Sequence, residues 1–573
     1  MTKFEDSSQF TRRLSTTQLD CGQTLRELSS YHDIALWWFA HFDFIDSLLG
    51  LPDNNTDYKP KQLKFQARIS KLPASFLAGL NFCFDLARKM FIKTVLAFYG
   101  RNKLKPDRSA PKILFTAEDL MWRSVRDYET RQIRKSDAFF DSLTQALRRS
   151  GSFYLVSTYP FVKYAYPLGE AVQSTRILVD KLRNWDVPHR PPNLYWTAGI
   201  WKAEYKASRY FRKAWKALAD DKKFRQLCVL NGRDIFDFAS RKIRFYFLVL
   251  FPYALKRIEM SKRMLDIERP DLVLLINEYG VFERALLVAG KSNHIPTVAI
   301  QHGNITPSHQ GYMYAPDEIS ESADIKFPHC PIPDKTAVFG PYFKHLLTAV
   351  SSYPESRVVV TGPPRYDALD TLQKRCTRKS ILSSYGLDDE KKIVLWTTQC
   401  IGLSDEENIR NFRAVRAAVD QLKETVIIIK QHPREGGRYT RMITRHLDLP
   451  RQDVLLVPKT ADTLSLIRAC DAMITKFSTT AIEAIALDKP LIIMNLGEDP
   501  DKVEFVNQQV ALGVYQDKDL APAIQKMVNA DADMAEHRKE YIEQYLYRID
   551  GQAAQRVVNL IKRTIETGPG NEK

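Results

Sequence analysis

The second half of the chain carries short apolar runs at regular spacing. Each run has four or five residues, and the intervals between runs leave room for helices. Near-continuous apolar strands that alternate with helices predict a parallel β-sheet covered on both faces. In such sheets, ligands bind beyond the carboxyl ends of the strands. The predicted strands are Thr336–Phe339, Arg357–Thr361, Lys392–Trp396, Thr425–Ile429, Val454–Val457, Ala472–Thr475 and Leu491–Met494.

The first half shows the same pattern with interruptions. A chain of 573 residues is too long for one core, so several domains are expected. The first about 105 residues are helical and aromatic, with a turn-rich break at Leu51–Asn55, and a basic helical insertion separates the second and third strands. The expected elements are strands at Lys112–Thr116, Ser152–Ser157, Asp271–Ile276 and Ile295–Ile300 and a helix at Asp137–Arg148. The expected divisions are 1–105, 106–335 with an insertion at about 198–265, 336–535, and a C-terminal helix and tail at 536–573.

Two junctions between a strand and a helix contain residues suited to an anion. In Val426–Pro433 the strand ends in Lys-Gln-His-Pro, and in Ala472–Glu483 a run of hydroxyls opens a helix. Free N–H groups and the helix dipole favour a phosphate at such a position. Because Ser and Thr are also common N-caps, ordinary helix starts explain each junction equally well when it is taken alone.

Positive charge is concentrated in one segment. The chain has a formal net charge of +16, and Trp201–Met264 holds 17 Lys and Arg against 6 Asp and Glu, interleaved with aromatic residues. Such a segment suits an anionic membrane surface, a phosphorylated acceptor or nucleic acid, or it is a solvated helix face. No nucleic-acid-binding motif accompanies it, so nucleic acid is the least favoured partner.

Two aromatic segments near the N-terminus suit a membrane interface. Phe76–Tyr99 is mostly apolar but carries Asp85, Arg88, Lys89 and Lys93, and Trp37–Leu49 forms a second patch. Neither is an uncharged run of about 20 residues, so no spanning helix is expected. Each segment either lies in a membrane interface or packs on the protein's own core.

The remaining composition points to a reducing compartment. Seven cysteines are scattered without a CxxC pair, and the N-terminus lacks the pattern of a secretory signal. We therefore expect a cytoplasmic protein. There is no zinc-ligand spacing and no Asp-x-Asp motif after a strand, so the sequence predicts no metal site and a metal-independent reaction.

Five motifs occur in a fixed order along the chain. They are Gln301-His302-Gly303, Val360–Asp367, Trp396–Gln399, Lys430–Pro433 and Ser478–Ala484. Together they resemble the GT-B glycosyltransferases of surface-polysaccharide synthesis, a group that includes capsule Kdo transferases, polysialyltransferases and CDP-glycerol glycerophosphotransferases. The resemblance covers roughly Lys112–Ile561 and is strongest over Asp271–Val514. It implies two Rossmann-like domains facing a cleft, with the acceptor held by the first and the nucleotide donor by the second.

The resemblance assigns the donor phosphates to the second domain. His432 would donate a hydrogen bond and Lys430 a charge, while the hydroxyls after Thr475 would add further donors. Glu483 would accept from a ribose, or serve as a capping-box partner of Thr480. Gly362 and Arg365 would approach the donor, or form a rigid turn near the hinge. The donor-site residues expected in this way are Gly303, Gly362, Arg365, Thr398, Gln399, Lys430, His432, Pro433, Ser478, Thr479, Thr480 and Glu483.

The acceptor hydroxyl needs a base from the first domain. Glu278 follows a predicted strand and loosely resembles the acidic motif of polysialyltransferases, although Asn277 replaces one acid. His302 lies where the cleft should open, and Gly303 permits close backbone approach. Asp119 is the third candidate. The sequence leaves the choice among Glu278, His302 and Asp119 open.

Three functions fit these residues. The first is a glycosyltransferase, inverting and without a cofactor, that moves a sugar from a nucleotide-sugar donor to a lipid-linked or polymeric acceptor at the inner membrane face. The second is a glycerol- or ribitol-phosphate transferase, or a sugar-nucleotide 2-epimerase, on the same fold. The third is a non-catalytic scaffold, which the presence of Glu278, His302 and His432 in one chain disfavours.

Overall fold

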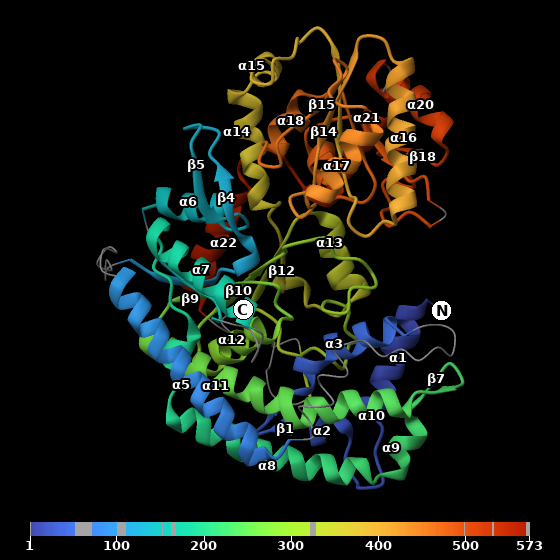
Figure 1. The fold of residues 1–573 in the computed structure, drawn as a ribbon. Coiled ribbons are helices and arrows are strands. Elements are labelled where there is room, and N and C mark those ends of the chain that lie inside the picture. The colour runs from blue at the N-terminus through green and yellow to red at the C-terminus, as the bar shows by residue number, and fades with distance from the viewer. Residues whose placement is uncertain are drawn as a thin grey trace.

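Two six-stranded parallel sheets form the centres of two α/β domains (Figure 1). The computed structural model describes residues 2–51, 72–99, 110–151, 153–161, 168–320, 328–497, 499–529 and 532–568. The two Rossmann-like domains of the GT-B fold are thus confirmed. In spatial order the first sheet consists of β12 (Val358–Val360), β11 (Lys335–Val338), β10 (Thr297–Ile300), β9 (Leu272–Ile276), β3 (Lys112–Thr116) and β6 (Tyr154–Thr158). The second consists of β15 (Val454–Leu456), β14 (Thr425–Lys430), β13 (Lys392–Thr397), β16 (Ala472–Thr475), β17 (Leu491–Met494) and β18 (Leu512–Val514).

The division between the two sheets lies later than residue 335. β11 begins at that position and β12 lies beyond it, yet β11 pairs with β10 and β12 pairs with β11, all in parallel. An apolar run shows that a strand exists but does not show which sheet it joins. The first domain therefore extends at least to Val360.

A small hairpin precedes the first helix of the first domain. β4 (Trp122–Arg126) and β5 (Ile133–Asp137) pair antiparallel, and the helix that was expected from residue 137 starts later, as α6 (Asp141–Arg149). The Asp137 carboxylate accepts the backbone N–H groups of Phe139 and Phe140, at 2.9 and 3.0 Å. These bonds hold a turn at Asp137 in place of a helical start.

Helices cover both sheets and build the N-terminal region (Figure 1). In the first 268 residues they are α1 (Lys3–Thr16), α2 (Leu25–Leu28), α3 (Trp37–Leu49), α5 (Ala74–Tyr99), α6, α7 (Leu168–Asn184), α8 (Ala198–Ala219), α9 (Lys222–Leu227), α10 (Phe236–Phe245), the π-helix η3 (Tyr246–Leu250) and α11 (Phe251–Glu268). The later ones are α12 (Val281–Ser292), α13 (Pro341–His345), α14 (Asp367–Arg375), α15 (Arg378–Ser383), α16 (Asp405–Gln421), α17 (Gly437–His446), α18 (Thr463–Ala469), α19 (Thr480–Ala486), α20 (Leu520–Asn529), α21 (Ala532–Tyr541) and α22 (Ala553–Thr567), with π-helices η4 (Leu346–Val350) and η8 (Ile542–Leu546). Short hairpins join β1 (Ser30–Tyr31) to β2 (Ile34–Ala35) and β7 (Val229–Leu230) to β8 (Arg233–Asp234).

The aromatic residues of the insertion and of α3 pack against each other. Trp37 and Trp38 of α3 are fully buried in one cluster with Phe211 of α8 and Tyr246 of η3. These residues therefore form the core of the helical region, so Trp37 and Trp38 pack on the protein's own core, the second of the two interpretations left open for Trp37–Leu49. The expected break at Leu51–Asn55 lies almost wholly outside the described residues. In the part of the chain that the structure describes, no helix is both long and apolar enough to cross a membrane.

The C-terminal helix returns to the first domain. Val557 and Ile561 of α22 are fully buried in the cluster that contains Ile113 of β3, and Figure 1 shows α22 beside α6. The Asp367 carboxylate accepts the N–H groups of Ala553 and Ala554, at 2.9 and 2.8 Å, and so caps the start of α22. The chain thus crosses twice between the domains.

Candidate active site

Polar side chains gather at the carboxyl edge of the first sheet. Glu118 follows β3, Asn277 follows β9 and His302 follows β10, and these three strands are neighbours. Glu118 is 7% exposed, and Nδ2 of Asn277 lies 3.5 Å from its Oε1. Because the strands are parallel, all three side chains belong to one edge of the sheet. Of these three residues, only His302 was assigned a functional role from the sequence.

His302 is half-buried beside a carboxylate. Burial lowers its pKa, while the negative charge of Glu118 opposes the shift. Its Nδ1 atom is buried and has no hydrogen-bond partner among the described residues. The ring centroid of Tyr279 lies 6.2 Å away. At neutral pH this imidazole is therefore mainly neutral, the state in which it can accept a proton.

Gln301 fixes the loop that carries His302. Its side-chain amide donates to the Gly303 carbonyl at 2.8 Å and accepts the Phe339 N–H at 2.8 Å. Gly303 has no positive φ, and a Cβ there would meet nothing within 4 Å. The loop conformation itself therefore does not require glycine at position 303.

A second histidine borders the same edge. His309 packs edge-to-face against Tyr279 and Tyr312, with ring centroids 5.1 and 5.0 Å apart. Burial and the neighbouring His302 lower its pKa to about 4, so its ring stays neutral. Phe42 of α3 stacks on Tyr279 at 4.8 Å, which brings the N-terminal helical region to this site. His309 was missed because no motif surrounds it in the sequence.

The other two candidate bases are engaged within the protein. Glu278 is 3% exposed and accepts a hydrogen bond from the Tyr353 hydroxyl at 2.7 Å, and burial raises its pKa to about 7. Asp119 lies 2.9 Å from Nζ of the buried Lys181. In this conformation a substrate hydroxyl does not reach the Glu278 carboxyl, and Asp119 serves an ion pair.

At the carboxyl edge of the second sheet, a buried carboxylate joins two loops. Glu435 is 1% exposed; its two oxygens accept the Thr398 hydroxyl and the Cys400 N–H, both at 2.7 Å. Lys459 donates to the Glu435 carbonyl. Glu435 therefore holds the loop after β13 against the loop after β14. It follows the Lys-Gln-His-Pro motif by two residues, but no pattern in the sequence distinguishes it.

Replacement of Glu435 tests this link. In Glu435→Ala the Cys400 N–H and the Thr398 hydroxyl lose their buried acceptor, so we expect a loss of roughly 1–3 kcal/mol in the free energy of unfolding. Calorimetry of the full chain should show a lower melting temperature. Glu406→Ala, which removes an exposed carboxylate at the start of α16, is the matched control and should change little. Equal melting temperatures for the two variants would contradict a structural role for Glu435.

The expected phosphate ligands of the second domain differ in how they are engaged. Lys430 donates to the carbonyls of Gln431 and Lys459, at 3.0 and 2.8 Å, and burial lowers its pKa. Nδ1 of His432 accepts the Arg434 N–H at 3.2 Å, so the neutral ring carries its proton on Nε2. His432 is therefore better placed than Lys430 to donate to a ligand. The neighbouring Pro433 is exposed.

The hydroxyl run opens α19 as expected from the sequence. Ser478 Oγ accepts the Thr480 N–H at 3.2 Å, and Thr480 Oγ1 lies 3.4 Å from Thr397 Oγ1 at the end of β13. Thr479 is exposed. The Ser478 hydroxyl therefore accepts the first N–H of α19, that of Thr480 contacts the neighbouring strand end, and that of Thr479 faces solvent.

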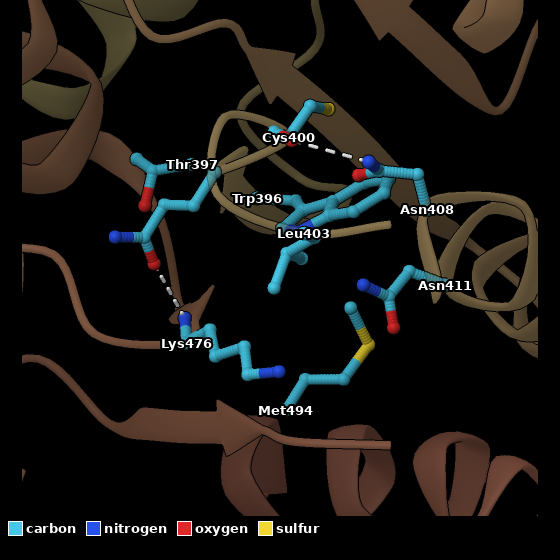
Figure 2. Close-up of a pocket in the computed structure, with 9 residues that line it drawn as sticks. Trp396, Thr397, Cys400, Leu403, Asn408, Asn411, Lys476 and Met494 are labelled. Atoms are coloured by element: carbon cyan, nitrogen blue, oxygen red, sulfur yellow. Dashed lines mark hydrogen bonds between the residues drawn. The ribbon is translucent and has the colours of Figure 1, made fainter. Parts of the chain in front are cut away.

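Gln399 ties the ends of β13 and β16 together beside a small pocket. Its Oε1 accepts the N–H groups of Lys476 and Phe477, at 3.0 and 2.7 Å. Figure 2 shows Lys476 and Met494 facing the pocket, whose volume of about 10 Å³ is near that needed by a single water molecule. Its lining consists of Trp396, Thr397, Gln399, Cys400, Leu403, Asn408, Asn411, Lys476 and Met494.

Arg365, Gly362 and Glu483 lie between the domains. Arg365 forms an ion pair with Glu483 at 3.2 Å and packs over the Tyr366 ring. Gly362 has a φ of +80°, and a Cβ there would meet Arg556 and Ala553 at 3.1 and 3.2 Å. The turn therefore requires glycine for backbone conformation and for close packing on α22. Among the described residues, no group of three or more His, Cys, Asp or Glu could hold a metal ion.

Comparison with known proteins assigns the chain to a family. A model of the CDP-glycerol:poly(glycerophosphate) glycerophosphotransferase family matches residues 274–563. No curated protein matches the chain. Structures that it resembles include S. aureus MnaA with UDP (14% identity, 80% of this chain and 97% of that chain, TM-score 0.44). A second is UDP-GlcNAc 2-epimerase from Neisseria meningitidis bound to UDP-GlcNAc (13% identity, 79% of this chain and 100% of that chain, TM-score 0.47). A third is the wall teichoic acid polymerase TagF with CDPG (10% identity, 85% of this chain and 98% of that chain, TM-score 0.42). Since the family model spans more than half of its 573 residues, the chain belongs to the CDP-glycerol:poly(glycerophosphate) glycerophosphotransferase family.

Proposed function

We propose that the protein transfers a glycerol-phosphate-type group from a CDP-linked donor to a hydroxyl of a surface-polymer acceptor. The observation that carries the proposal is the half-buried His302 beside Glu118, at a sheet edge within a chain of this family. This is the second of the three functions expected from the sequence. The first of them, transfer of a sugar from a nucleotide-sugar donor, would use the same two sheet edges. The two reactions differ in the nucleotide that they release.

In the proposed reaction His302 takes the proton of the acceptor hydroxyl. The acceptor oxygen forms a bond to the phosphorus that carries the glycerol, and the bond from this phosphorus to the bridging oxygen breaks. CMP leaves with the electron pair. The Glu118 carboxylate stabilises the imidazolium that forms, because its charge favours the protonated ring. No group in the protein becomes covalently modified.

The second domain would stabilise the leaving group. His432, with its proton on Nε2, would donate to the CMP phosphate, and the backbone and hydroxyls at Ser478–Thr480 would add neutral donors. Phosphoryl transfer requires mainly positioning and charge stabilisation, which this arrangement of donors supplies. A cytoplasmic location at the inner membrane face, predicted from the sequence, belongs to the same proposal.

The identity of the released nucleotide tests the reaction. The purified protein would be incubated with CDP-glycerol, CDP-ribitol or UDP-N-acetylglucosamine and a membrane-derived polymer acceptor, and the products separated by ion-exchange chromatography. Attack at phosphorus releases CMP, whereas attack at carbon releases a nucleoside diphosphate. We expect CMP and incorporation of glycerol or ribitol label into the polymer. Release of CDP or UDP with sugar incorporation would instead identify a glycosyltransferase, and His302→Ala is the control for background hydrolysis.

A further inference from the structure

Helix α5 carries its apolar face outward. Along its 26 residues, about 39 Å of helix, one stripe contains only uncharged residues, and all of them are exposed. Phe76, Phe84, Met90 and Phe98 are 57%, 46%, 56% and 77% exposed. The stripe is formed by Phe76, Gly79, Leu80, Cys83, Phe84, Leu86, Ala87, Met90, Phe91, Thr94, Ala97 and Phe98. An ordinary surface helix has the reverse arrangement, with its apolar stripe on the core.

The inward face of α5 is held by buried polar contacts and by Ile92 and Val95, which pack in a small apolar cluster with Leu178 and Leu182 of α7. Asp85 is 4% exposed and lies 2.8 Å from Nζ of Lys256, which also lies 3.2 Å from Glu204 of α8. Burial disfavours the charged form of Lys256, but the carboxylates of Glu204 and Asp85 outweigh this effect, so the pKa of Lys256 is raised. Asn81 donates to Glu204 at 3.1 Å, and Lys89 donates to the Trp196 carbonyl at 2.6 Å. These buried contacts fix the rotation of α5, so the outward direction of the apolar stripe is built into the fold.

The helix that supports α5 carries a row of positive charge. Lys202, Lys206, Arg209, Lys213 and Lys216 follow one another at intervals of three or four residues on α8, and all are exposed. The opposite face of α8 packs inward through Ile200, Ala207, Phe211 and Leu218. α8 contacts α5, and the Trp201 indole donates to the Ala78 carbonyl of α5 at 2.8 Å. The apolar stripe therefore lies on a helix whose neighbour carries a basic row on its exposed face.

We propose that α5 lies in the interface of an anionic lipid bilayer, with the basic row of α8 on the lipid headgroups. A large exposed apolar stripe gains free energy when it enters the acyl boundary, and nearby Lys and Arg are attracted to anionic lipid. This charge complementarity favours a membrane over a neutral protein partner. The binding energy thus comes from α5 and the exposed face of α8, while Phe211, Tyr246 and Phe247 of the insertion stay in the core.

Fluorescent labelling locates the inserted surface. Cys83 lies on the stripe, and Cys21 is an exposed free cysteine outside α5. The full chain would be prepared as Cys21→Ser, labelled at Cys83, and as Cys83→Ser, labelled at Cys21, each with a polarity-sensitive dye. On vesicles of phosphatidylglycerol and phosphatidylcholine we expect a blue shift from the Cys83 label and none from the Cys21 label. Equal responses from the two labels would overturn the proposal.

Co-sedimentation measures the energetic contribution of each helix. Phe84→Glu with Met90→Glu should weaken binding to the same vesicles at least tenfold, whereas Ile267→Glu with Val350→Glu, which alters equally exposed apolar residues elsewhere, should not. Lys206→Gln with Lys213→Gln should cost roughly fivefold per charge and flatten the salt dependence. Unchanged binding in the α5 variant would overturn the proposal. The proposal would also be overturned if the lipid-free chain self-associated and the α5 variant abolished this self-association, because α5 would then be a protein interface.

Discussion

The His302→Ala variant is expected to lose roughly 10²–10⁴-fold in kcat with little change in donor affinity. His302 follows β10 at the carboxyl edge of the first sheet, and the donor is proposed to bind the second domain, so the substitution should remove proton transfer and leave nucleotide binding intact. Steady-state kinetics of CMP release, together with calorimetric titration of CDP, separates the two effects.

His294→Asn is the matched control. His294 precedes β10 at its opposite end, is exposed and has a φ of 55°, a conformation that Asn tolerates. Its replacement removes an imidazole from the other end of the same strand, away from the site, so activity should be retained. If His302→Ala kept more than about a tenth of the activity of His294→Asn, His302 would not be the base, and Glu278→Gln and Asp119→Asn would be the next variants to assay.

The pH profile provides an independent measure of the same group. A general base acts in its neutral form, and burial lowers the pKa of His302 below its ordinary value, so kcat/KM should fall only on the acidic side of that value. Glu118 opposes this shift. Glu118→Gln removes the negative charge and should move the acidic limb to still lower pH, while kcat decreases because the base is weaker. A limb that stays in place would show that Glu118 does not act on His302.

The strands could be predicted from the sequence because each is a buried apolar run. Lys112–Thr116, Ala472–Thr475 and Leu491–Met494 have the predicted bounds. β18 was missed, since Leu512–Val514 contains only three residues, one of them Gly513. The β4–β5 hairpin was missed for a different reason. Its strands are rich in charged and polar residues and are only partly buried, so they carry no hydrophobic signal.

For the candidate site, the sequence predicts which residues follow a strand but not which of their side chains meet. Position along the chain shows that a residue follows a strand but not where its side chain points, because loops break the alternation of strands. Asn277 illustrates this limit. Its φ of 55° turns the chain after β9, and the next residue, Glu278, enters the core to meet Tyr353. Glu118 and Asp119 are adjacent, yet one lies near His302 and the other pairs with Lys181.

The orientation of α5 lay outside what the sequence could decide. Phe76–Tyr99 is amphipathic under either interpretation, and the pattern alone favours burial of the apolar side. Its orientation depends on Lys256, which lies far along the chain and forms ion pairs with both Asp85 of α5 and Glu204 of α8. Long-range ion pairs of this kind leave no local periodicity from which they could be inferred.

The second large effect is expected at His432. His432→Ala should weaken CDP binding by roughly 10–150-fold, because a hydrogen bond to a charged phosphate contributes about 1.5–3 kcal/mol. His432→Gln keeps an N–H donor near the position of Nε2 and should restore part of the affinity. Since burial lowers the pKa of His432, the ring binds as a neutral donor, and affinity should change little between pH 7 and 8.

The thermal shift of the protein with CDP measures the contribution of His432 to nucleotide binding. A ligand at 100 times its dissociation constant stabilises the folded state by about 2.7 kcal/mol, so a variant with affinity reduced a hundredfold should show a much smaller shift at the same concentration. The matched control is His537→Gln on α21, whose ring lies 3.0 Å from the Asp533 carbonyl, and it should shift like the wild type. An equal shift in His432→Ala would place the donor phosphates elsewhere. Because His302→Ala is expected to spare this shift and His432→Ala to remove it, the pair separates chemistry in the first domain from donor binding in the second.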